Sequence, residues 1–359
     1  MDFGLDDEQT MIVQTIRRFT DRDLRAWAAD ADRAGAAPEK LAATAGEMGF
    51  FLDAVPADAG GLLEGAYSHT TRALRGFELG RGCAAMAALL EANVEPSLAV
   101  AKWGDDAAKK AVFAALEGGG LATTWRDARG SLSIDGDRVT GKIGPAPALA
   151  RASFVLVIAD GLVTILPVGG AKALDPAPTS WRACAWGTMQ VDGLSGFTLA
   201  RGGAAPAVSE EILSWWKTSL AARAAGVAAA AMEHADKYGR ERVQFGQPIG
   251  KFESLIRLRD DAETGSAAAR LMALHAAWAI DHGRSATAAH DAASRARAFA
   301  GDVVAKATID AVQILGGYGF VNDYPVEKLM RDARGFDAVV GDERLDRALA
   351  IKATIGAEA

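Results

Sequence analysis

The chain has 359 residues, of which 50% are hydrophobic and 24% charged, a composition that favours a globular fold with a substantial core. Its net charge of −7 and isoelectric point of about 5.4 argue against non-specific binding to nucleic acid or to anionic membranes. The sequence contains no apolar run of about 18 residues, so no membrane-spanning segment is predicted.

The N-terminal residues and the cysteines bear on location. The first ten residues, MDFGLDDEQT, are acidic, which predicts neither a secretory signal nor a transit peptide. Cys83 and Cys184 lie far apart without metal or redox spacing, which favours two buried thiols in a reducing compartment. The five histidines show no ligand spacing either. We therefore expect a cytoplasmic protein without a metal site.

The first region, residues 1–120, is predicted to be an all-helical domain. Asp6 or Asp7 can cap a first helix that carries Ile16 and Phe19 on one face. Further Ala- and Leu-rich stretches continue the helical pattern. The segment DAVPADAGG interrupts it, because proline and paired glycines are typical of a loop.

The second region, residues 121–207, is predicted to be a small antiparallel β-domain. SLSIDGDRVTG alternates apolar and polar residues around Asp135-Gly136, and FVLVIADGLVTILPV repeats this arrangement around Asp160-Gly161. Aspartate followed by glycine between two such runs indicates a hairpin turn.

The third region, residues 208–359, is predicted to be a helical bundle domain. Three long Ala-rich stretches follow one another, the third is ended by Gly316-Gly317, and a short helical stretch, RLDRALAIKATIG, comes last. Small residues on long helices allow the close approach that a four-helix bundle requires. The predicted fold class is thus α+β, mainly α.

Several local motifs, in the order helical, β, helical, resemble those of the acyl-CoA dehydrogenase family. RERVQFGQPIGKF is similar to the family's Arg-x-x-Phe-Gly-x-Pro-Ile loop between two long helices. DAVQILGGYGFVNDYPVEKLMRDAR is similar to its Gln-x-x-Gly-Gly segment and the Pro-x-x-x-x-x-Arg-Asp run after it. VPADAGG resembles a further, less specific Pro-x-x-x-Gly-Gly loop. The resemblance covers nearly the whole chain and implies the acyl-CoA dehydrogenase fold.

The resemblance also implies an FAD, whose ADP half contacts these motifs while the cofactor lies mainly in a neighbouring subunit. The Arg242 guanidinium can match pyrophosphate oxygens, and the glycines let a ligand approach the backbone closely. The alternative is that Arg242 is a surface arginine and that Gly316 only ends a helix. The positions carried over as cofactor-binding are Arg242, Gln244, Phe245, Gln313, Gly316 and Gly317.

The family's catalytic base is missing from both places where it is expected. In most members a glutamate takes the α-proton of the thioester, ten residues after the methionine of the Met-Arg-Asp run. Counting from Met330 leads to Val340, which cannot accept a proton. A second family position, near the start of the first long helix of the bundle, falls on Trp216, followed by Lys217. Glu210 and Glu211 could reach that position only with a shifted alignment.

The β-domain departs from the family as well. The segments that line the flavin ring in the family carry Thr-Glu-Pro with Gly-Ser-Asp, and Trp-Ile-Thr/Ser. They are replaced here by LATTWRDARGS and GKIGPAPALA, and neither Trp125 nor Trp186 lies at the matching place. With the missing base, this predicts no catalytic residue in this chain.

The favoured hypothesis is a non-catalytic subunit of a heteromeric acyl-CoA dehydrogenase, such as a heterotetramer acting in fatty acid or steroid degradation. A catalytic partner chain would supply the base, an acyl-CoA would be the substrate, and electron-transferring flavoprotein the electron acceptor by analogy. The first alternative is a self-sufficient, homo-oligomeric flavoenzyme whose base is displaced to Asp342 or Glu343. The second alternative is a non-enzymatic scaffold homolog.

Overall fold

The computed structural model describes residues 4–341, 346 and 348 of the chain. Its first part is helical, as predicted. Asp6 caps the first helix, since its carboxylate accepts a hydrogen bond from the Gln9 backbone N–H at 2.7 Å and the Gln9 side chain accepts one in return. Ile16 and Phe19 of this helix are buried. The helices are α1 (Asp7–Phe19), α2 (Arg25–Ala34), α3 (Glu39–Glu47), α4 (His69–Gly82), α5 (Ala84–Leu90), α6 (Val94–Trp103) and α7 (Asp106–Glu117), with a π-helical segment (Thr20–Leu24) joining α1 to α2.

Two four-stranded sheets follow the helices. One has the strand order β1-β4-β5-β8 and the other β2-β3-β7-β6. All pairs are antiparallel except β1 with β4, which run parallel because the connection between them passes through the other sheet. The strands are β1 (Leu121–Arg126), β2 (Ser133–Asp135), β3 (Arg138–Ala146), β4 (Ala152–Ala159), β5 (Leu162–Pro167), β6 (Lys172–Ala173), β7 (Gly187–Ser195) and β8 (Phe197–Arg201).

Both predicted hairpin turns are present. β4 and β5 are joined by Asp160 and Gly161, and Gly161 has a φ of 70°, a conformation that glycine adopts without strain. In the other hairpin Asp135 still belongs to β2, and the two turn residues are Gly136 and Asp137. Alternate residues of these strands point between the two sheets and form a separate apolar core.

Three long helices form most of the last part: α8 (Ala205–Glu241), α9 (Glu253–Asp281) and α10 (Ala286–Leu315). A short hairpin of β9 (Val243–Gln244) and β10 (Gln247–Pro248) joins α8 to α9, and α11 (Val326–Gly335) follows α10. The predicted last helix, RLDRALAIKATIG, lies almost entirely outside the described residues.

Helix α4 packs against α8 at glycine contacts. A Cβ on Gly226 would lie 2.0 Å from the carbonyl oxygen of Phe77, and one on Gly80 would lie 2.2 Å from that of Arg223. Only glycine allows the two backbones to approach so closely. The N-terminal helices are thereby joined to the bundle through its core.

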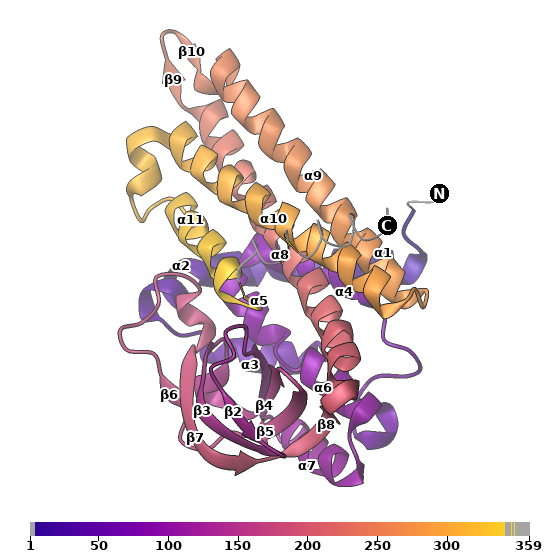
Figure 1. Cartoon of the computed structure of the whole chain (residues 1–359). Coiled ribbons are helices and arrows are strands. Elements are labelled where there is room, and N and C mark those ends of the chain that lie inside the picture. Colours follow the sequence, from indigo (N-terminus) through magenta and orange to yellow (C-terminus); the bar gives the residue numbers. More distant parts are fainter. Residues whose placement is uncertain (1–3, 342–345, 347, 349–359) are drawn as a thin grey trace.

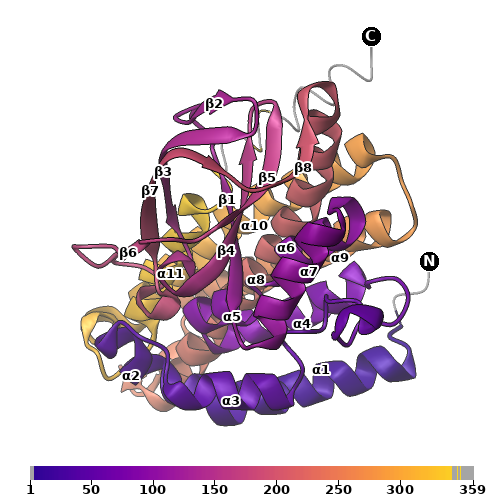
Figure 2. The same ribbon diagram turned by 90° about the horizontal axis from the view of Figure 1, so that it is seen from below.

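The long helices extend away from the strands, and the β9–β10 hairpin lies at their far tip (Figure 1). Helix α11 lies between the bundle and the sheets. In the view from below, α1 and α3 lie on the side of the molecule opposite β2 and β3 (Figure 2). None of the described helices is long and apolar enough to cross a bilayer.

Candidate functional site

The segment 336–341, where the family resemblance places the base, is held by one arginine of α10. Arg297 Nη2 donates hydrogen bonds to the carbonyl oxygens of Phe336, Val339 and Gly341 at 2.8, 2.7 and 2.8 Å. Arg297 is only 4% exposed, so these charge-assisted bonds form in a nearly water-free environment. The segment is therefore fixed at three points along its backbone.

Val340 itself is buried, with 4% of its surface exposed. Its carbonyl oxygen accepts a hydrogen bond from Arg126 Nη1 of β1 at 3.2 Å. Its backbone has a φ of 68°, and a β-branched residue in this left-handed region is strained. Packing and hydrogen bonds hold the residue in place despite that strain.

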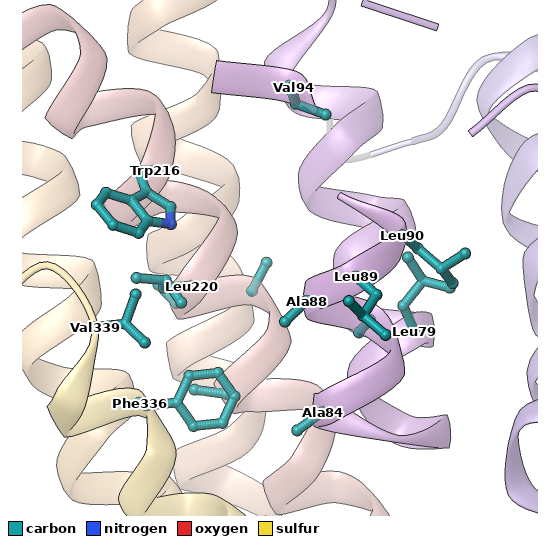
Figure 3. Packing of buried hydrophobic residues seen from close by; sticks show 14 of the residues in the cluster. Leu79, Ala84, Ala88, Leu89, Leu90, Val94, Trp216, Leu220, Phe336 and Val339 are labelled. Carbon is teal, nitrogen blue, oxygen red and sulfur yellow. The ribbon is translucent and has the colours of Figure 1, made fainter. Parts of the chain in front are cut away.

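The space beside this segment is largely filled with apolar side chains. Trp216 from α8 and Val339 face each other across it, and Phe336 packs below them towards Ala84 and Ala88 of α5 (Figure 3). The remaining cavity has a volume of about 20 Å³, room for roughly one water molecule. It is lined by Ala88, Glu91, Ala92, Glu95, Thr123, Thr124, Pro147, Trp181, Trp216, Arg223 and Val339.

Two glutamates line this cavity that the sequence analysis did not consider. Glu91 is bonded to Arg72 at 3.3 Å and to Arg75 at 3.1 Å, and Glu95 is bonded to Arg72 at 2.7 Å. Burial alone would raise the pKa of Glu91, but Arg72, Arg75 and Arg223 outweigh it and lower the pKa to about 2.

A general base needs a pKa near the working pH, so Glu91 cannot serve as one at neutral pH. The cluster has a recognisable sequence signal, because two arginines three residues apart on α4 precede two glutamates four residues apart, Glu91 directly after α5 and Glu95 on α6. Only the folded chain shows that these groups pair.

Lys217, the neighbour of Trp216, is fully buried and bound to polar groups. Its Nζ lies 2.7 Å from Asp346 Oδ1, 3.1 Å from His290 Nε2 and 3.0 Å from Ser294 Oγ. Burial, opposed in part by Asp346, lowers the pKa of Lys217 to about 8. Asp346 also pairs with Arg297, so this carboxylate has two cationic partners and is no free base.

The other carboxylates considered from the sequence do not reach the small cavity. Glu211 pairs with Lys102, and neither Glu210 nor Glu211 is among the residues that line the cavity. Asp342 and Glu343 lie outside the described residues. Among the described residues, no carboxylate without a cationic partner borders this space.

The strand side of the cavity carries threonines and a proline. Thr123 Oγ1 donates a hydrogen bond to the carbonyl oxygen of Pro147 at 2.7 Å.

Trp125 and Trp186, which do not lie at the family's flavin-ring positions, both pack against the interior of the protein. Trp125 packs on the core between the sheets, and the Trp186 indole N–H donates to the carbonyl oxygen of Trp181 at 3.1 Å.

A larger cavity lies at the outer end of the bundle. It has a volume of about 510 Å³ and brings together four predicted cofactor positions from distant parts of the sequence: Arg242, Gln244, Gly316 and Gly317. Its remaining lining is Tyr238, Ile249, Ile314, Leu315, Tyr318 and Val321. The resemblance assigns the ADP half of FAD to this place.

The groups that face this cavity are accessible. Arg242 is exposed and lies over the Tyr318 ring, with its guanidinium carbon 5.9 Å from the ring centre, and no ion pair joins it to a described carboxylate. Gly316 has φ 59° and ψ −132°, a conformation open almost only to glycine. Neither Gly316 nor Gly317 has an atom within 4 Å of where a Cβ would lie, so their backbone faces open space.

Two predicted cofactor positions do not line the cavity. Phe245 is 93% exposed at the tip of the β9–β10 hairpin, and Gln313 is exposed on α10. The ring centre of Phe245 lies 6.3 Å from that of Phe252.

Known families match both helical parts of the chain. The model described as "Acyl-CoA dehydrogenase, N-terminal domain" matches residues 6–119, and the one described as "Acyl-CoA dehydrogenase, C-terminal domain" matches residues 206–354. The segment between the two matches is the two-sheet region.

Curated relatives agree with these matches. An acyl-CoA dehydrogenase of Bacillus subtilis (strain 168) is 41% identical over 140 residues, which is 39% of this chain and 36% of that protein. Benzylmalonyl-CoA dehydrogenase of Aromatoleum aromaticum is 29% identical over 364 residues, 93% of this chain and 94% of that protein. The match to the first four curated relatives spans only 32–36% of their length.

Solved structures share the fold over the whole chain. Butyryl-CoA dehydrogenase from Megasphaera elsdenii has a TM-score of 0.86 at 22% identity and covers 99% of this chain and 100% of its own. PigA, solved with FAD and proline, has a TM-score of 0.85 at 20% identity with full coverage of both chains.

Proposed function

The chain belongs to the acyl-CoA dehydrogenase family, and we propose that it is the non-catalytic subunit of a heteromeric, FAD-dependent member of that family. In this proposal a partner chain supplies the base and the flavin-ring site for the α,β-dehydrogenation of an acyl-CoA. The present chain supplies the face that contacts the ADP half of the partner's FAD.

The difference in size between the two cavities carries the proposal. The cavity beside Val339 and Trp216 has about 20 Å³, far less than an isoalloxazine ring and an acyl thioester occupy. The cavity beside Arg242 and Gly316 has about 510 Å³ and faces solvent. The residues present therefore fit the ADP half of FAD but not its ring.

In the assembled enzyme, bound FAD would accept the hydride from the substrate's β-carbon. The role of this chain is to bind and orient the cofactor. Arg242 would place its guanidinium fork against the pyrophosphate, and Gly316 and Gly317 would let the adenosine half approach the backbone. No proton transfer is assigned to this chain, because the glutamates at the small cavity are neutralised by arginines.

In this proposal the partner chain determines which acyl substrate and which electron acceptor the enzyme uses. The acyl-CoA would bind in the partner's pocket, and electron-transferring flavoprotein would take the electrons. Acyl-group specificity would therefore change with the partner and not with substitutions around Val340.

The test is the flavin absorbance of the purified chain, alone and co-expressed with an acyl-CoA dehydrogenase chain encoded beside it. Alone, we expect little FAD and no dehydrogenase activity. Co-expressed, we expect about one FAD per pair and turnover of an acyl-CoA. Arg242→Gln in the co-expressed pair should lower the FAD content, whereas the same change at Arg240, which pairs with Asp236 at 2.5 Å, should not.

Stoichiometric FAD together with turnover in the lone homo-oligomer would contradict the proposal and would favour a displaced base, for which Asp342→Asn and Glu343→Gln are the next variants. A lone chain that bound neither FAD nor any partner would favour the scaffold alternative.

A further inference from the structure

A further cavity, of about 590 Å³, lies where α4, α8 and α9 meet, and it shares no lining residue with the two cavities described above. The apolar part of its wall consists of Leu5, Leu74, Phe77, Ala229, Met232, Ala267, Leu271 and Leu274. The polar part consists of Glu233, Asp236, Glu263, Ser266 and Arg270. Small-molecule sites typically have volumes of about 300–1,000 Å³, so this cavity is large enough for a ligand.

Each carboxylate of this wall already has a cationic partner. The pairs are Glu233 with Arg81 at 2.7 Å and with Arg25, Asp236 with Arg240 at 2.5 Å, and Glu263 with Arg259 at 3.8 Å. The Ser266 hydroxyl donates a hydrogen bond to the carbonyl oxygen of Ala225 at 2.9 Å. The negative charges of the wall are therefore largely balanced by arginines that do not line the cavity.

Arg270 is the only lysine or arginine that lines this cavity, and no described carboxylate lies within ion-pair distance of it. Its Nε is enclosed and therefore closed to a ligand. The two Nη groups donate to no described residue either, but they keep accessible surface on a half-buried side chain. They are the donors that an anion in the cavity can reach, and two neighbouring N–H groups match a carboxylate.

The guanidinium of Arg270 is held by an aromatic ring of the same wall. Its central carbon lies 4.5 Å from the centre of the Phe77 ring, so one face of the group is covered. Burial lowers the pKa of Arg270, and Glu78 opposes this effect in part. An arginine nevertheless stays protonated at physiological pH. A partly desolvated charge without a counter-ion is costly, and an anionic ligand would remove that cost.

From these observations we propose that this cavity binds a small amphiphilic carboxylate, a monocarboxylic acid with an apolar tail. Its carboxylate would accept hydrogen bonds from the Nη groups of Arg270, and its tail would pack against Leu74, Met232 and Leu274. A single negative charge fits better than two, because three carboxylates lie in the same wall. Binding here needs neither FAD nor a partner chain, so its test is independent of the function proposed above.

Three ligands of one tail length test the charge preference by calorimetry on the full chain: octanoate, 1-octanol and octylamine. We expect octanoate to bind about three- to thirty-fold more tightly than 1-octanol, since a charge-assisted pair at a half-buried arginine contributes modestly. Octylamine should bind more weakly than 1-octanol. Equal affinities of octanoate and 1-octanol, or no binding of octanoate at millimolar concentration, would overturn the proposal.

Arg270→Gln should remove the advantage of octanoate over 1-octanol and leave the binding of 1-octanol in place. Arg284→Gln is the matched control, because Arg284 also lies over an aromatic ring, 5.2 Å from the centre of Trp278, but is exposed and does not line the cavity. The control should keep the preference for octanoate. Loss of this preference in both variants, or in neither, would overturn the assignment to Arg270.

A third substitution tests the apolar part of the cavity. Ala267 lines the cavity and is exposed on α9, so the larger side chain in Ala267→Trp should narrow the cavity and weaken octanoate and 1-octanol alike. Ala288→Trp, at an exposed position in the first turn of α10, should weaken neither ligand. Unchanged affinity for both ligands in Ala267→Trp would show that they bind elsewhere and would contradict the proposal.

Discussion

Val340 is a β-branched residue held at a backbone φ of 68°, at the position where the family motif counts to a glutamate. It is buried, and its carbonyl oxygen is bonded to Arg126. The Val340 side chain therefore occupies a buried position, whereas a catalytic base at this position would have to be accessible to the substrate. Trp216 fills the second family position in the same way, with 7% of its surface exposed.

Val340→Glu should consequently not create an active enzyme. A carboxylate would replace a buried apolar side chain, and we expect the free energy of unfolding to fall by roughly 2–4 kcal/mol, measured by urea denaturation. Val340→Thr, which changes polarity at nearly constant size, should cost about 1–2 kcal/mol. Recovery of FAD binding and turnover by Val340→Glu alone would show that the small cavity beside Val339 and Trp216 can open and that only the base is missing.

At the scale of elements, the segment after α11 owes its conformation to α10. One guanidinium of Arg297 binds three carbonyl oxygens of the segment, and the same side chain pairs with Asp346 beyond it. Lys217 of α8 pairs with Asp346 from the other side. The segment 336–341 is thus bonded to α10 through Arg297 and to β1 through Arg126, and Asp346 beyond it is bonded to both α8 and α10.

Arg297→Gln should release this segment. An amide cannot serve three carbonyl oxygens and Asp346 together, so buried acceptors would lose their partners, at a cost of about 3–5 kcal/mol. Hydrogen exchange should accelerate at the backbone amides of residues 336–341. Arg295→Gln is the control on the same helix, since its ion pair with Asp291 at 2.9 Å is partly exposed and should contribute under about 1 kcal/mol. Equal exchange in both variants would contradict the role of Arg297.

For the whole molecule, buried polar groups lie where the N-terminal helices meet the bundle. Glu91 of the first region accepts a hydrogen bond from Ser219 of α8 at 2.6 Å. His69 stacks on Trp215 across the same boundary, and within the bundle His290 of α10 contacts Lys217 of α8. The stability of the molecule therefore depends on the protonation of groups at these contacts.

We expect stability to fall as pH falls from about 6.5 towards 4. Burial lowers the pKa of His69 to about 3 and those of His234 and His290 to about 4, below the ordinary 6.5. In that pH range the unfolded chain binds protons that the folded chain does not, so each histidine costs up to about 1.4 kcal/mol per pH unit. Urea denaturation should show that the free energy of unfolding falls by about 2 kcal/mol or more between pH 7 and pH 5.

His234→Gln should make this pH dependence less steep, because one of the three groups no longer titrates. A free energy of unfolding that stays constant from pH 7 to pH 5 would contradict the burial of these histidines.

Much of the architecture could be predicted from local signals. The Asp6 cap, the Asp160-Gly161 turn and the end of α10 at Gly316 each depend on residues close in sequence, and the structure confirms them. The helical, β, helical order and the family were likewise predicted from the motifs. The parallel pairing of β1 with β4 could not be, because it joins strands that have no turn between them.

For the site, the sequence by itself determined which residues occupy the family positions: Val340 and Trp216 in place of a base, and Arg242 and Gly316 on the cofactor side. Counting along the chain suffices for that, since a motif sets its own register. Only the tertiary structure decided that Val340 is buried, that Trp216 borders a cavity of about 20 Å³, and that Arg242 and Gly316 border one of about 510 Å³. It also decided that Glu91 is neutralised by Arg72, because burial and ion pairing depend on groups that only folding brings together.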